Sequence, residues 1–110
     1  MANVSLLPLA VIHQNNIYRN HILKITNDRV ELTKLERECE ATKFISSVII
    51  VANNNIVSHL NQLPKIGENY NNLPEIAEFL KLNKFYNNNE ELTLISASPS
   101  SGYQIIEYSL

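Results

Sequence analysis

The chain has 110 residues, 45% of them hydrophobic and 18% charged, with a formal net charge of −2 at neutral pH. This composition is typical of one globular domain that buries a core, here taken as residues 1–110. Lys and Arg are scattered, and no stretch approaches the roughly 20 apolar residues that cross a bilayer, so we expect a cytoplasmic protein with neither a nucleic-acid nor a membrane partner.

The first third of the chain predicts a β-meander, with strands over 4–14, 17–26 and 29–35. The β-branched and aliphatic residues of these segments suit a pleated surface, and the Asn-containing dipeptides between them suit tight turns. Pro8 lies inside the first segment. Because proline cannot donate to a strand ladder, Pro8 indicates either an edge strand or a bulge.

The first turn sets the register of the predicted meander. With Asn15-Asn16 as a two-residue turn, His13 lies opposite Tyr18. Side chains alternate along a strand, so this register places His21 on the other face of the hairpin from His13. The two histidines are therefore not expected to share a metal site.

A central strand is predicted over 43–52, where Phe44 to Ala52 form the longest nearly unbroken apolar run of the chain. The run lacks a polar–apolar alternation, which indicates burial on both faces. Three asparagines end it. The following segment, 56–63, has the apolar spacing of a short helix, and a strand is the alternative for its first residues.

A helix is predicted over 73–86, because Asn72 has the character of an N-cap and Pro74 suits the first turn. The chain then predicts a hairpin with strands 91–97 and 103–108, joined by a loop that contains Pro and Gly. The expected fold is α+β and mainly β: a small sandwich-like or helix-covered sheet.

Few residues offer catalytic chemistry. The three histidines have no metal-binding spacing, and Cys39 lies between two glutamates whose charges disfavour the reactive thiolate. The acidic residues of segment 36–40 are interrupted by Arg37 and lack the pattern of a calcium loop. Two glycines in the whole chain exclude a phosphate-binding loop. We therefore expect no catalytic residue, no metal and no cofactor.

A contact with a ligand or a partner protein suits side chains that combine an apolar body with a polar group. The residues selected on this ground are His13, His21, Tyr86, Tyr103 and Tyr108.

Segment 17–32, with its Asn27-Asp28-Arg29-Val30 turn, and the hydrophobic run Val48-Ile49-Ile50-Val51 together resemble the start of amidohydrolase-superfamily enzymes. In that family a strand–turn–strand unit of a small β-sandwich precedes the first strand of a catalytic barrel. The resemblance covers residues 5–52 and implies a sandwich-like module. The metal-binding motif that follows in the family is replaced here by Asn53-Asn54-Asn55, so no catalytic residue is carried over.

These patterns favour a non-catalytic domain that acts through protein–protein association, with itself as a homodimer or with a partner protein. The alternative is a small-ligand binding protein or minor enzyme with a pocket between the helix 73–86 and the sheet. Oligomeric state and the shape of any pocket distinguish the two.

Overall fold

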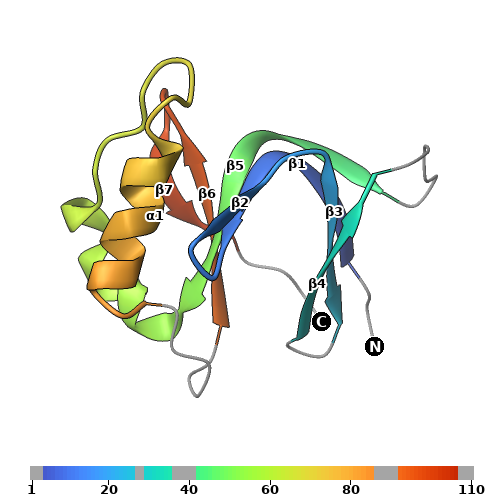
Figure 1. The fold of residues 1–110 in the computed structure, drawn as a ribbon, viewed down its shortest axis with the longest axis horizontal. Helices are drawn as coiled ribbons and strands as arrows, with labels where there is room; N and C mark the ends of the chain where they lie inside the picture. Colours follow the sequence, from blue (N-terminus) through green and yellow to red (C-terminus); the bar gives the residue numbers. More distant parts are fainter. Residues whose placement is uncertain (1–3, 27–28, 36–41, 86–91, 107–110) are drawn as a thin grey trace.

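The computed structural model describes residues 4–26, 29–35, 42–85 and 92–106 (Figure 1). Within these residues the chain forms one mixed seven-stranded sheet and two helices, which confirms a mainly-β α+β fold. The strands are β1 (Val4–His13), β2 (Asn16–Tyr18), β3 (His21–Thr26), β4 (Arg29–Lys34), β5 (Lys43–Asn53), β6 (Leu92–Ser98) and β7 (Gly102–Ile105). The helices are the 3₁₀ helix η1 (Asn54–Gln62) and the α-helix α1 (Leu73–Leu82). No helix in the described ranges has the length and apolar character needed to span a bilayer.

The predicted central strand lies in the interior of the sheet as β5. The strand order is β4-β3-β1-β5-β6-β7, with β2 paired to β1, and every described pair is antiparallel except β1 and β5. All residues from Ser47 to Asn53 are buried. β-branched side chains pack well on both faces of such a strand, which explains the absence of a polar–apolar alternation.

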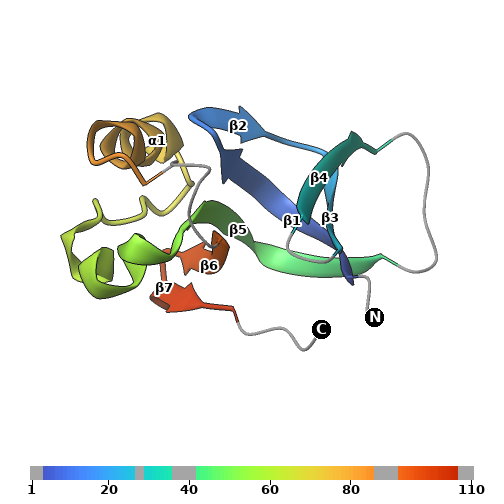
Figure 2. The ribbon, with the colours of Figure 1, turned by 90° about the horizontal axis from the view of Figure 1, so that it is seen from below.

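The sheet is strongly curved, and each of its faces carries a hydrophobic cluster (Figures 1 and 2). The outer cluster lies under α1 and η1 and includes Ile50, Ile56, Ile76, Leu80 and Ile95. The inner cluster lies inside the curve formed with β3 and β4 and includes Leu6, Val11, Leu23, Ile49 and Leu94. Neighbouring residues of β5 therefore pack in different clusters.

Pro8 marks a bulge rather than an edge. The pairing of β1 with β5 shifts between Pro8 and Ala10, and β1 lies inside the sheet between β3 and β5. Leu6 and Val11 belong to the same inner cluster although five positions separate them, so the alternation of side chains is broken between them. A proline suits this position because an irregular ladder does not need its missing N–H.

The predicted register of the first hairpin is wrong. The turn residues are Gln14 and Asn15, with φ of 50° and 67°, so His13 pairs with Asn16 and not with Tyr18. Two positive φ values in succession are typical of the turn that matches the twist of paired strands. The predicted strand 17–26 is also divided, because Asn20 has a φ of 58° and separates β2 from β3.

The second half of the chain also departs from the prediction at element ends. Residues 56–62 of the predicted segment belong to η1, and Leu63 is its C-cap. The first turn of η1 is capped by the Asn53 side chain, which accepts a hydrogen bond from the Asn55 N–H at 3.1 Å. Helix α1 ends at Leu82 rather than at residue 86, and Asn72 makes no side-chain capping bond to it. Cys39, the acidic segment 36–40, Tyr86 and Tyr108 lie outside the described residues.

Candidate functional site

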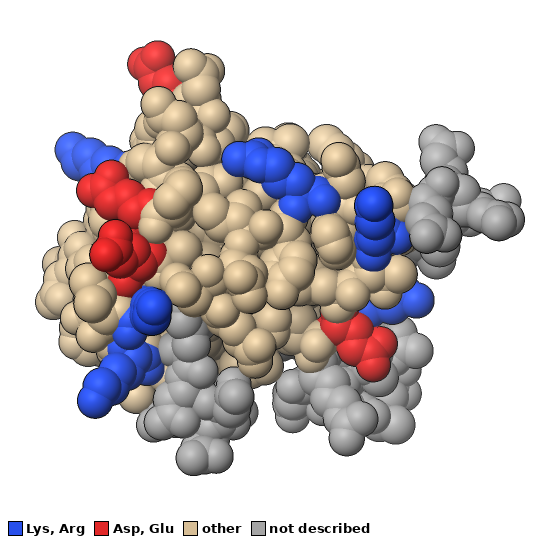
Figure 3. Space-filling view, in the orientation of Figure 1, with Lys and Arg blue, Asp and Glu red and all other residues tan. Residues whose placement is uncertain are grey.

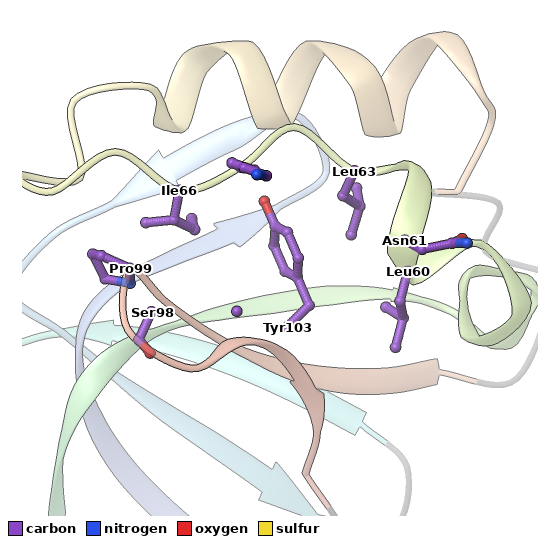
Figure 4. A pocket seen from close by; sticks show the side chains of 9 residues that line it. Leu60, Asn61, Leu63, Ile66, Ser98, Pro99 and Tyr103 are labelled. Carbon is purple, nitrogen blue, oxygen red and sulfur yellow. The ribbon is translucent and has the colours of Figure 1, made fainter.

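A cavity lies between η1, the segment after it and the tip of the β6–β7 hairpin (Figure 4). Its volume is about 570 Å³, which is within the range of small-molecule sites. The lining residues are mainly apolar: Leu60, Asn61, Leu63, Lys65, Ile66, Ser98, Pro99, Gly102 and Tyr103. No residue of α1 lines this cavity, so it differs in place from the pocket that the sequence suggested.

Tyr103 stands in this cavity and connects its two walls. The side chain extends from β7 toward the segment that follows η1, and its hydroxyl donates a hydrogen bond to the Pro64 carbonyl (Figure 4). Burial, with a smaller contribution from the Glu75 carboxylate, raises the pKa of Tyr103 to about 12. The phenol is therefore neutral at physiological pH and acts as a hydrogen-bond donor.

The wall that faces Tyr103 is held by a side-chain amide instead of regular secondary structure. The Asn72 side chain accepts a hydrogen bond from the Gly67 N–H at 2.9 Å and donates one to the Lys65 carbonyl. These bonds satisfy main-chain groups of a segment that is neither helix nor strand. Asn72 thus shapes the cavity wall, although the sequence indicated a helix cap.

A second, smaller hollow of about 320 Å³ is lined mostly by hydroxyl groups. It includes six serines of β5, β6 and the hairpin tip, together with Tyr70 and Gln104. Ser47 and Ser96 share a hydrogen bond of 2.8 Å between their hydroxyl oxygens across β5 and β6. That bond satisfies the hydroxyl of the buried Ser47. The hydroxyl groups of this hollow therefore help to join β5 to β6.

The outer edge of β7 is unpaired in the described part of the chain, and β7 lies at one margin of the sheet (Figure 2). The Ile106 N–H donates to the Leu94 carbonyl at 2.9 Å, which directs the main chain of residue 106 toward β6. Main-chain groups alternate in direction along a strand, so those of Tyr103 and Ile105 point away from the sheet. This edge offers hydrogen-bonding groups to an added strand.

The sequence-selected residues do not form one site. Of the five, Tyr103 alone among the described residues lines the cavity. His21 lies beside Tyr18 with ring centroids 5.2 Å apart, and its Nδ1 is 2.8 Å from the Arg19 carbonyl oxygen. Tyr86 and Tyr108 are not described.

His13 lies at the end of β1, and its Nδ1 atom is buried without a hydrogen-bond partner. Burial lowers the pKa of His13 below its usual value of 6.5. No group of three or more His, Cys, Asp or Glu residues within the described ranges is arranged to hold a metal ion.

Sequence reasoning missed most of the cavity lining. Leu60, Leu63 and Ile66 come from η1 and the segment after it, whereas Ser98 and Pro99 come from the hairpin tip. In the sequence, Leu60 and Leu63 indicated a helix face, whereas Ile66, Ser98 and Pro99 lay in predicted loops. Their proximity depends on how η1 packs beside β6 and β7, which no local pattern reveals.

Charged side chains are scattered over the face shown in Figure 3, and its middle carries few of them. Basic side chains do not gather there into a continuous patch.

Comparisons of the chain with family models, curated proteins and solved structures found no match. The resemblance of residues 5–52 to the amidohydrolase superfamily therefore stays a prediction.

Proposed function

We propose that this protein is a non-catalytic cytoplasmic domain that acts through protein–protein association, and that the outer edge of β7 is its contact surface. The observation that carries the proposal is the outward main chain of Tyr103 and Ile105, which no described strand covers. Extended segments commonly bind by adding to such an edge, where main-chain hydrogen bonds supply affinity.

The contrast with the other end of the sheet supports this choice. β4 contains Arg29, Glu31 and Lys34 among its six residues, whereas β7 (Gly-Tyr-Gln-Ile) contains neither a charge nor a proline. Natural edge strands usually carry such residues, because they discourage pairing with another chain. Ile105 is also 41% exposed, which leaves apolar area for a partner to cover.

A proline substitution tests the edge directly. Ile105→Pro removes one outward N–H and leaves the bonds between β6 and β7 in place, so we expect it to reduce association measured by light scattering. The matched control is Lys34→Pro. The Leu35 N–H donates inward to the Asn20 carbonyl at 2.8 Å, so the Lys34 N–H points outward from the opposite edge.

An Ile105→Pro variant that associates as the unmodified protein does would show that β7 is not the contact surface. Circular dichroism of both proline variants establishes that the fold is retained before the masses are compared.

The cavity favours a second candidate function, the binding of a small and mainly apolar ligand. Its size suits such a molecule, and the exposed Lys65 and Asn61 offer a cation and an amide to a hydrogen-bond acceptor on the ligand. Among the described residues that line it there is no carboxylate, histidine or cysteine, which supports binding rather than acid–base catalysis.

The probe anilinonaphthalene sulfonate combines apolar rings with an anionic group and tests this candidate. We expect Leu63→Trp to fill the cavity and abolish the probe's fluorescence gain. Leu82→Trp, at a side chain that is 72% exposed, is the matched control. Equal probe binding by the two variants would contradict a site in this cavity.

A further inference from the structure

Building on the proposed association, we propose that the partner of β7 is a second copy of this chain. The two β7 strands pair antiparallel about a two-fold axis that passes beside Gln104. In this register Tyr103 lies opposite the partner's Ile105, and the two Gln104 residues lie opposite each other. The sheet thereby continues from one copy into the other.

The main chain of β7 is suited to this register. The outward-pointing groups belong to Tyr103 and Ile105, which are the residues that the two-fold axis brings together. In an antiparallel ladder such a pair exchanges both of its N–H···O bonds. The symmetry creates the same pair twice. A shift of the register by one residue would oppose outward groups to inward ones and lose these bonds.

The side chains of β7 are also self-complementary. Tyr103 and Ile105 are paired within the sheet to Ala97 and Ile95, which belong to the outer cluster, so both side chains lie on the face that carries η1. Across the proposed interface each tyrosine therefore meets an isoleucine. Pairs of an aromatic and a β-branched side chain stabilise neighbouring strands.

Gln104 lies on the opposite face and is exposed. Its main chain points toward β6, so the two Gln104 residues form the closer, non-hydrogen-bonded kind of pair. An amide side chain carries both donors and an acceptor, and two facing amides can satisfy each other. No like charges meet across the axis, because the described residues of β7 are all uncharged.

The same register places the partner's Ile105 beside Tyr103 at the cavity. A second copy then covers apolar surface that a single copy leaves to water at Ile105. Main-chain hydrogen bonds along the four residues of β7 form only a small contact. The burial of Ile105 adds the apolar contribution that makes the pairing favourable.

A charge exchange at the two-fold axis tests the register. In Gln104→Lys two ammonium groups face each other, and in Gln104→Glu two carboxylates do, so each variant alone should shift from dimer to monomer in light scattering. Mixing the two variants places opposite charges across the axis and should restore the dimer. Glu31→Lys and Lys34→Glu on β4 are the matched controls, and both should stay dimeric.

The outcomes separate this inference from the general proposal of association. An unmodified protein that is monomeric up to near-millimolar concentration overturns the self-pairing. A dimer that persists in both Gln104 variants, yet dissociates in Ile105→Pro, overturns the register about Gln104 and leaves β7 as the contact surface. A dimer that survives all three substitutions overturns both.

Discussion

His13 illustrates how one half-buried side chain can set a pH dependence. Its Nδ1 is buried without a partner, and burial lowers its pKa in the folded protein. The unfolded chain therefore binds the proton first as the pH falls below about 6.5, and stability is lost there; above that pH this contribution is constant. We expect His13→Gln to flatten the fall in melting temperature between pH 7 and pH 5. An unchanged slope in the variant would assign the effect to another group.

Tyr103 sets the opposite end of the pH range. Its raised pKa of about 12, against 10.0 for the free side chain, means that the unfolded chain loses the phenolic proton first. Its contribution to stability is complete below pH 10 and is lost as the pH rises toward 12. Tyr103→Phe should remove this alkaline loss. The variant should also be less stable by about 1 kcal/mol at neutral pH in urea titration, because the Pro64 carbonyl loses its donor. A variant as stable as the original would show that water replaces the hydroxyl at no cost.

At the scale of elements, the β6–β7 hairpin depends on Gly102. Its φ is 71°, a conformation that side chains with a Cβ rarely adopt, and no atom lies within 4 Å of the place a Cβ would take. The cost of Gly102→Ala is therefore one of backbone conformation, about 1–2 kcal/mol in chemical denaturation. Gly102→Asn is the matched variant and should cost less, because asparagine tolerates positive φ. Equal losses for Ala and Asn would show that space, and not φ, is limiting.

Gly67 provides an instructive contrast within the cavity wall. A Cβ there would clash with the Asn71 side-chain oxygen, while the backbone has no positive φ. The constraint is one of space, and the Asn71 side chain can move. A side chain is therefore disfavoured at the two glycines for different reasons: backbone conformation at Gly102 and space at Gly67.

At the scale of the whole molecule, the two hydrophobic clusters should melt together. Ile49 packs in the inner cluster and Ile50 in the outer one, yet both belong to β5 and both are fully buried. We expect Ile49→Val and Ile50→Val each to lower stability by about 1 kcal/mol and each to shift one shared transition. The unfolding of each variant is followed by far-ultraviolet circular dichroism and by tyrosine fluorescence, and the two transitions should coincide. Transitions that separate in only one variant would show that the clusters unfold independently.

The sequence by itself determined most of the elements. The apolar run of β5, the proline at the start of α1 and the Pro–Gly pairing of the last hairpin are local signals, because χ1 stiffness, proline φ and glycine freedom act within a few residues. Because these signals act over only a few residues, they do not specify the exact position at which an element begins or ends. Turn position and helix end differ by one to four residues, and a turn of Gln14 and Asn15 competes with the neighbouring Asn15-Asn16.

Only the tertiary structure decided how these elements meet. The parallel pairing of β1 with β5, the bulge at Pro8 and the cavity between η1 and β7 all join residues distant in the chain. Alternation along a strand specifies which side chains share a face, but not which strand lies beside it. The strand neighbours of β5 are determined by the requirement that both of its faces be buried at the same time. Consequently Tyr103 was selectable from its residue type, whereas its place in a cavity beside an open sheet edge was not.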